Sequence, residues 1–160
     1  MPPILFLDFD GCLHPDAVFL VNREPVLRSP GSQLFEHADL LSELLKPYPR
    51  LQIVLCTAWV QTLGFGRAKG YLPRPLQERI IGSTYEYCSD LYTWFELTRF
   101  DQIMQYVRNK DIQAWLALDD DYHGWPVVFE SHLISPDRNL GLGEPRTREK
   151  LMAKLELIHK

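Results

Sequence analysis

The chain begins, after three residues, with the stretch ILFLDFDG, residues 4–11, in which an apolar run ends in two acidic residues and a glycine. An unbroken apolar run is typical of a central strand in a parallel sheet, because helices cover both of its faces. We expect this strand over residues 4–8. It brings Asp8 and Asp10 to its carboxyl end, which is the edge where open α/β sheets bind ligands. This one stretch therefore predicts both the fold class and the place of a reactive site.

Strand patterns alternate with helix patterns along the rest of the chain. Further apolar runs predict buried strands, and apolar residues at helical spacing predict helices, two of them with Ser32 and Thr98 as N-caps. The expected strands are 51–56, 114–118, 127–129 and 132–134, and the expected helices are 32–45, 76–80, 99–109 and 147–158. Alternation of this kind predicts an α/β fold, a Rossmann-like parallel sheet with helices on both faces.

Two stretches do not fit this alternation. Between residues 12 and 30, a β-prone run at 17–21 is followed by the turn residues 22–25 and a return strand that begins at Val26. This pattern predicts a short hairpin flap beside the first strand. Residues 64–75 are rich in glycine, arginine and proline, so we expect a loop there. Neither stretch is long enough for a large cap over the site.

Composition limits the protein class. A chain of 160 residues, 46% of them hydrophobic, is long enough for one cored domain and short for two, so we expect a single domain over 1–160. The net charge of −4 gives no basic footprint for nucleic acid. Three cysteines, an odd number without framework spacing, favour a reducing compartment, and we expect the cytoplasm. No run suggests a membrane span or a signal peptide, and the oligomeric state is not indicated.

Polar residues follow three of the expected strands directly. Asp8 and Asp10 follow the first, Thr57 follows the second, and Asp119 and Asp120 follow the third. In a parallel sheet these positions meet at one edge. Carboxylates so close repel one another, and a bound cation relieves the repulsion. Mg²⁺ takes one or two carboxylates together with phosphate oxygens, so the pattern indicates a phosphorylated substrate.

Each of these groups suits a step of phosphoryl transfer. Asp8 is a candidate nucleophile that would form an aspartyl-phosphate. Asp10 is a candidate general acid for the leaving oxygen and a base for water. Thr57 offers a hydroxyl donor to a phosphate oxygen. His14 and His123 lie nearby in loops and are expected to face solvent, and Trp59 is expected to pack in the interior.

The same residues resemble the motifs of the haloacid dehalogenase (HAD)-like phosphohydrolase superfamily. DFDGCL at 8–13 is similar to its first motif, Thr57 to its second and LDD at 118–120 to its fourth. The resemblance implies that Asp8 is the nucleophile and Asp10 the acid/base. It implies Mg²⁺ on the Asp8 side chain, the Asp10 backbone carbonyl and Asp119, with Asp120 helping directly or through water.

The basic residue of the third motif is less clearly marked. Arg99 is our choice, because it opens a helix about one helix and a loop before the acidic strand. Lys69, Arg67 and Lys110 remain open as alternatives.

A closer resemblance is to a small capless branch, the HAD domain of bacterial Swiss Army Knife RNA-repair proteins. It rests on DGCLHP at 10–15, Trp59, Arg99 with Ile103, LDDD at 118–121 and Gly141-Leu142. The resemblance implies a phosphatase whose substrate is a phosphorylated small molecule, a nucleotide or a nucleic-acid end. The alternative is a non-catalytic phosphate-binding or interaction module that retains the fold.

Overall fold

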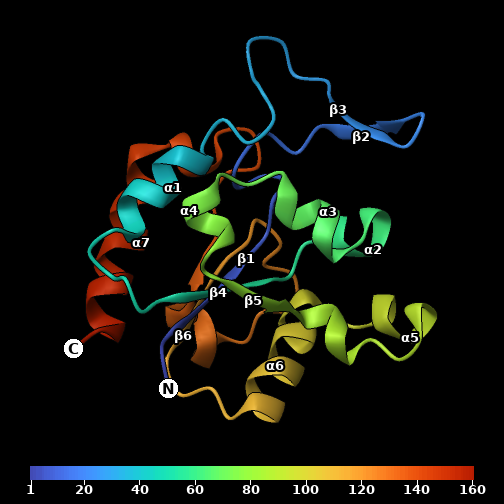
Figure 1. Ribbon diagram of the computed structural model, residues 1–160. Coiled ribbons are helices and arrows are strands. Elements are labelled where there is room, and N and C mark those ends of the chain that lie inside the picture. The colour runs from blue at the N-terminus through green and yellow to red at the C-terminus, as the bar shows by residue number, and fades with distance from the viewer.

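The predicted parallel sheet is present and contains five strands (Figure 1). The computed structural model describes residues 1–160. The strands are β1 (Ile4–Leu7), β4 (Gln52–Leu55), β5 (Ile80–Ser83), β6 (Trp115–Leu118) and β7 (Leu133–Ile134). Their order is β5-β4-β1-β6-β7, and all neighbours are parallel. The sheet edge that carries the carboxyl ends of β1, β4 and β6 is therefore shared, as the strand pattern predicted.

Helices cover both faces of the sheet, which explains why β1 is apolar at every position. Leu5 and Leu7 belong to the larger core cluster, with α1 (Ala38–Leu45) and α7 (Pro145–Ile158). Ile4 and Phe6 belong to the second cluster, with α6 (Arg99–Lys110). Successive side chains of a strand point to opposite faces, so the two cores lie on the two sides of the sheet. None of the helices is both long and apolar enough to cross a bilayer.

Short helices and 3₁₀ turns fill several of the connections between the strands. They are α2 (Trp59–Leu63), α3 (Phe65–Gly70), α4 (Arg74–Gln77) and α5 (Leu91–Glu96), with 3₁₀ turns at Thr84–Tyr87, Val127–His132 and Gly141–Gly143. The loop predicted over 64–75 is therefore wrong, because most of it is helical. Gly64, at φ +90°, separates α2 from α3, and Pro75 lies in the first turn of α4, where proline is tolerated. In this segment the glycine and the proline mark the ends of short helices and do not indicate a loop.

Three other segments differ from the expected elements. Residues 80–83 form β5, a strand that was not predicted, because it lies at the edge of the sheet and Gly82 interrupts its apolar run. Residues 127–129 belong to a 3₁₀ turn, and β6 pairs instead with 133–134. The first helix begins at Ala38 and not after Ser32, because Phe35, at φ +57°, cannot continue a helix. The conformation of these segments therefore depends on tertiary contacts and not on local sequence.

The predicted hairpin is confirmed as β2 (Val18–Val21) and β3 (Glu24–Leu27). Asn22 and Arg23 form its two-residue turn, and both have positive φ, as in type I′ turns. The hairpin projects from the carboxyl edge of the sheet (blue in Figure 1). It is the segment inserted between β1 and α1 that stands beside the end of β1.

The loop after β1 is fixed by contacts with a distant part of the chain. The Leu142 N–H donates to the Cys12 carbonyl at 2.8 Å, and a Cβ at Gly141 would come within 2.6 Å of the same oxygen. Only glycine, with its positive φ of 55°, fits this close approach. The late Gly141-Leu142 pair therefore holds the loop that carries the acidic residues.

Candidate active site

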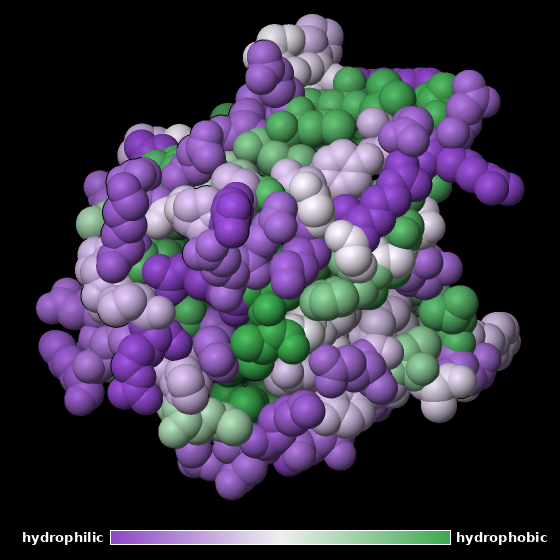
Figure 2. Space-filling view, in the orientation of Figure 1, coloured by the Kyte–Doolittle hydropathy of each residue, from purple (hydrophilic) through white to green (hydrophobic).

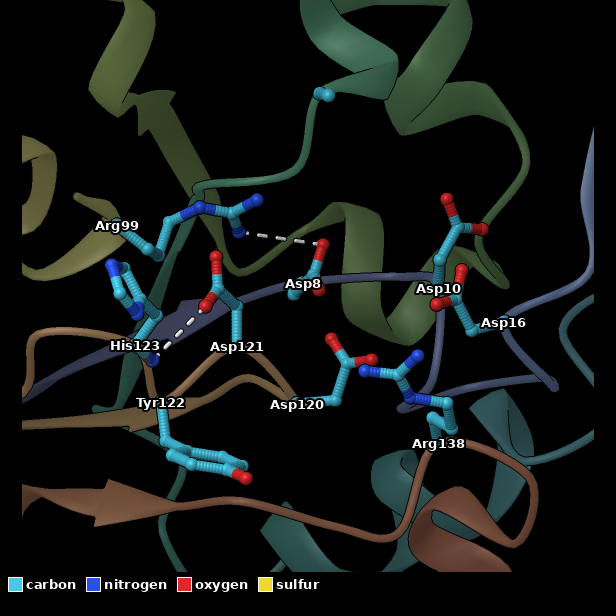
Figure 3. Close-up of a pocket in the computed structure, with 10 residues that line it drawn as sticks. Asp8, Asp10, Asp16, Arg99, Asp120, Asp121, Tyr122, His123 and Arg138 are labelled. Carbon is cyan, nitrogen blue, oxygen red and sulfur yellow. Dashed lines mark hydrogen bonds and ion pairs between the residues drawn. The ribbon is translucent and has the colours of Figure 1, made fainter. Parts of the chain in front are cut away.

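A polar pocket of about 500 Å³ opens at the carboxyl end of the sheet, beside the end of β1 (Figure 3). It is lined by the loops that follow β1, β4, β6 and β7 and by the first residue of α6. The lining residues are Asp8, Asp10, Asp16, Ala58, Arg99, Asp120, Asp121, Tyr122, His123 and Arg138. Half of these residues carry a carboxylate, so the pocket requires positive charge to stabilise its ionised form.

Arg99 supplies one positive charge under this pocket. Thr98 and Asp101 form a capping box at the start of α6, which fixes the helix end and therefore the position of Arg99. Its Nη1 lies 3.5 Å from Asp8 Oδ1 (Figure 3) and 2.7 Å from Asp119 Oδ2. Burial opposes the guanidinium charge, but these two carboxylates outweigh it, and the pKa of Arg99 lies above its usual range. Arg99 is therefore a permanent cation beside Asp8.

Asp119 lies beneath the pocket and does not line it. Its side chain is fully buried, and both of its oxygens are engaged, one by Arg99 and one by the Asp121 N–H at 3.0 Å. A buried carboxylate with two charge-assisted or backbone donors is rigidly placed. Asp119 thus holds Arg99 in position.

Asp120 turns instead toward Asp8. A Cβ at Gly11 would overlap the Asp120 carboxylate, so glycine at this position admits the side chain, and its φ of +78° suits the turn. Burial raises the pKa of Asp120 to about 8, and the nearby Asp8 carboxylate adds to the shift. Two carboxyl groups this close cannot both ionise freely without a cation. Asp8 and Asp120 together form the acidic face of the site.

We expect Asp120→Asn to stabilise the protein in EDTA, and more so at pH 8.5 than at pH 5.5. Folded Asp120 keeps its proton up to about pH 8, whereas the unfolded chain releases it near its ordinary pKa of about 4. The folded state therefore binds more protons in this window, and the stability of the wild type falls as pH rises. Thermal denaturation at both pH values measures the difference. A change in melting temperature that is the same at both would contradict the assignment.

Asp10 is held by two donors from different parts of the chain. His14 Nε2 lies 2.7 Å from Asp10 Oδ1, and Trp59 Nε1 lies 3.1 Å from each Asp10 oxygen. His14 is fully buried, so the expectation that it faces solvent is wrong, whereas His123 is exposed and Trp59 is buried as expected. The Asp10 carboxylate therefore has a fixed orientation.

The tautomer of His14 follows from its second contact. The Phe35 backbone N–H donates to His14 Nδ1 at 3.1 Å, so this nitrogen carries a lone pair. The ring proton then lies on Nε2, which donates to Asp10. Phe35 has a positive φ of 57°, an uncommon conformation for a bulky residue. That conformation orients the amide which fixes His14.

Thr57 follows β4 as predicted, but it is buried and does not line the pocket. Its Oγ1 accepts the Trp59 N–H at 3.2 Å, which connects the start of α2 to the strand end. The neighbouring Ala58 lines the pocket in its place. Thr57 therefore contributes to the position of Trp59.

The structure thus brings four of the six proposed site residues to the pocket wall. These are Asp8, Asp10, Arg99 and Asp120, whereas Asp119 and Thr57 lie behind it. The alternatives to Arg99 lie elsewhere: Arg67 contacts Glu24 of the hairpin, Lys110 faces Glu86 at the far end of α6, and Lys69 does not line the pocket.

Asp16 and Arg138 are among the pocket residues that were not sequence-based candidates. Asp16 and Arg138 face the pocket, and the Asp16 N–H donates to the Arg138 carbonyl at 2.9 Å. Burial raises the pKa of Asp16, and the Asp10 charge adds to this, whereas Arg138 opposes it. Only its place in the sequence could have indicated Arg138, which follows the last predicted strand by four residues and therefore lies at the same edge of the sheet. The loop that contains it carries no recognisable sequence motif.

The donor set fits a hard divalent cation. An oxygen of Asp8, an oxygen of Asp120 and Cys12 Sγ lie within 4.8 Å of one another. Mg²⁺ takes oxygen ligands, and burial raises the pKa of the Cys12 thiol well above its usual range, so the thiol is a poor third ligand. The site therefore suits a cation because of the two carboxylates, which repel each other when no cation is bound.

Comparison with known proteins agrees with this geometry. The family described as the HAD domain in Swiss Army Knife RNA repair proteins matches residues 4–147. The matched segment includes every residue of the pocket described above. No curated protein and no solved structure matches the chain significantly. Because the match covers most of the 160 residues, the chain belongs to this family of HAD domains.

Proposed function

We propose that the chain, as one domain over 1–160, is a magnesium-dependent phosphohydrolase that acts through an aspartyl-phosphate on Asp8. The observation that carries the proposal is the placement of Asp8, whose carboxylate lies between the Arg99 cation and the Asp120 carboxylate in an open pocket. The family supports the reaction class, since HAD domains belong to a phosphohydrolase superfamily that typically uses Mg²⁺.

The first half-reaction forms a bond between an Asp8 oxygen and phosphorus and breaks the bond from phosphorus to the leaving oxygen. Asp10 enters this step protonated and gives its proton to that leaving oxygen. In the second half-reaction, Asp10 accepts a proton from water as the water attacks phosphorus, and the Asp8–phosphorus bond breaks. Inorganic phosphate leaves, and both aspartates return to their initial states.

The cation, when bound, neutralises charge on the phosphoryl oxygens and on Asp8. We propose that the Asp8 and Asp120 side chains and the Asp10 backbone carbonyl hold it. The sequence-based expectation placed Asp119 on the cation with Asp120 helping. The proposal gives this place to Asp120 alone, because Asp119 has both oxygens engaged and Asp120 faces Asp8. Arg99 neutralises the remaining negative charge throughout the reaction.

The substrate class is a phosphate monoester. Nucleotides and nucleic-acid ends are included in the proposal because the family is described in RNA repair proteins and because the pocket is open to solvent on one side. The test is release of phosphate from 4-nitrophenyl phosphate and from a phosphorylated oligonucleotide, with Mg²⁺ and with EDTA. Binding of phosphate without turnover of any ester would instead support the non-catalytic module.

The contact between His14 and Asp10 predicts a positioning role for the histidine. We expect His14→Phe to lower kcat about tenfold to 100-fold, with little change in KM, because Asp10 loses its shortest hydrogen bond. The loss should be larger for an alkyl phosphate than for 4-nitrophenyl phosphate, because a nitrophenolate leaves without protonation.

The variant His14→Gln is the matched control, since an amide keeps one donor and one acceptor at this position. It should recover part of kcat on the alkyl ester. If His14→Phe slows both esters by the same factor, His14 is merely structural and the positioning role is wrong.

A further inference from the structure

A second pocket, of about 140 Å³, adjoins the first between the β2–β3 hairpin and α2. Its lining consists of Asp10, Val18, Leu20, Pro25, Ala58, Trp59, Thr62 and Leu63. Asp10 and Ala58 also line the polar pocket, so the two pockets meet at these residues. The Asp10 carboxylate therefore stands at the boundary between a charged site and an apolar one.

The hairpin forms the apolar wall of this second pocket, because alternate side chains of a strand lie on the same face. Val18 and Leu20 are two residues apart on β2, so their side chains share one face of the hairpin. Pro25 pairs with Leu20 across the strands and lies on that face too. Figure 2 shows apolar side chains gathered at the upper right, where the hairpin lies in Figure 1. Pro25 is buried on this face and Val18 is half-buried, whereas Leu20 is still 51% accessible to solvent.

Contacts with α3 fix the position of the hairpin. Arg67 of α3 contacts the Glu24 carboxylate at 2.9 Å and donates to the Arg23 carbonyl at 3.2 Å. Exposed ion pairs contribute little stability. They nevertheless define where the tip of the hairpin lies relative to α2 and α3, and hence the width of the apolar pocket.

The polar groups of this pocket already have partners. Trp59 Nε1 donates to Asp10, and the Thr62 hydroxyl donates to the Ala58 carbonyl at 3.2 Å. Apart from Asp10 and these two groups, the side chains of the lining are hydrocarbon. A charged or strongly polar group placed here would lose its hydration and find few hydrogen-bond partners away from Asp10. The occupant that suits the pocket is uncharged and apolar.

We propose that this pocket binds the leaving group of the substrate, and that this group carries an uncharged, apolar ring directly next to its phosphate. The inference rests on the proposed function. Asp10 must face the oxygen that it protonates, so the rest of the alcohol extends from the phosphate pocket past Asp10. A pocket of 140 Å³ is well below the roughly 300–1,000 Å³ of sites for drug-sized ligands, so one ring is the fitting size.

The experiment compares two alkyl phosphates of similar chemical reactivity, benzyl phosphate and 2-hydroxyethyl phosphate. Burial of the ring should favour benzyl phosphate in kcat/KM by about tenfold or more. Leu20→Ser should reduce this preference several-fold. Phe19→Ser is the matched control: Phe19 is also 51% exposed, on the same strand, but belongs to the opposite face. It should retain the wild-type preference.

Equal kcat/KM values for the two esters, with activity that depends on Mg²⁺, would overturn the ring pocket while the proposed function stands. If neither ester is hydrolysed, and 4-nitrophenyl phosphate and the phosphorylated oligonucleotide are not hydrolysed either, the proposed function fails. Calorimetric binding of benzylphosphonate against methylphosphonate then decides the pocket separately. Tighter binding of benzylphosphonate that Leu20→Ser weakens and Phe19→Ser does not would support it. Equal affinities would overturn it.

Discussion

Asp8→Asn should abolish Mg²⁺-dependent phosphate release, with a loss of at least about 10⁴-fold in kcat. An amide cannot attack phosphorus to form the acyl phosphate, and no other group in the pocket replaces it. The substitution conserves shape and removes one of two carboxylates that repel each other, since Asp8 contributes to the raised pKa of Asp120. The variant should therefore fold at least as stably as the wild type in EDTA, which separates chemistry from folding.

The control is Asp39→Asn, the same chemical change at an exposed position in the first turn of α1. It should leave kcat unchanged. A direct measurement of the intermediate is also available, because reduction of an aspartyl-phosphate with borohydride converts that residue to homoserine. Mass spectrometry should find this change at residue 8 of the wild type only after incubation with substrate. Phosphate release that persists in Asp8→Asn would exclude the covalent mechanism.

The buried elements of the fold were predictable because their sequences are consistent at every level. β1 and β6 are apolar throughout, and β4 is apolar after Gln52. All three lie in the centre of the sheet, and α6 has both its cap and its apolar face in sequence. β5 was missed because it lies at the edge of the sheet and a glycine, Gly82, interrupts its short apolar run. Its pairing with β4 gives it a strand conformation, and no local pattern records that contact.

The candidate site also has a part that the sequence predicts and a part that it does not. Topology alone brings Asp8, Asp10 and Asp120 to one edge, since each follows a buried parallel strand. The orientation of side chains at that edge was not predictable. Asp119 and Asp120 are adjacent in sequence, yet one lies buried under Arg99 and the other faces Asp8. His14 likewise became a buried partner of Asp10 through Phe35, a contact across 21 residues of chain.

Arg99→Met should lower both activity and stability. The substitution leaves Asp8 and Asp119 buried without their cation, and breaking a buried ion pair in this way costs about 3–5 kcal/mol in the free energy of unfolding. We expect kcat to fall about 10²–10³-fold, because charge on the transferring phosphoryl group loses a fixed partner. Burial already raises the pKa of Asp119, and without Arg99 only the hydrogen bond from the Asp121 N–H opposes that shift. Folded Asp119 then keeps its proton to higher pH, so the stability loss should be larger at pH 8 than at pH 5.

Two further variants separate the two roles of this arginine. Arg108→Met, at the exposed end of the same helix, should change stability by less than about 1 kcal/mol. The double variant Arg99→Met/Asp119→Asn removes the unpaired charge together with the cation, so it should recover part of the lost stability. It should recover none of the activity, because Asp8 and the phosphoryl group still lack the guanidinium. Urea denaturation and phosphate release measure the two effects independently. Wild-type kcat in Arg99→Met would return the basic role to Lys69, Arg67 or Lys110, none of which lines the pocket.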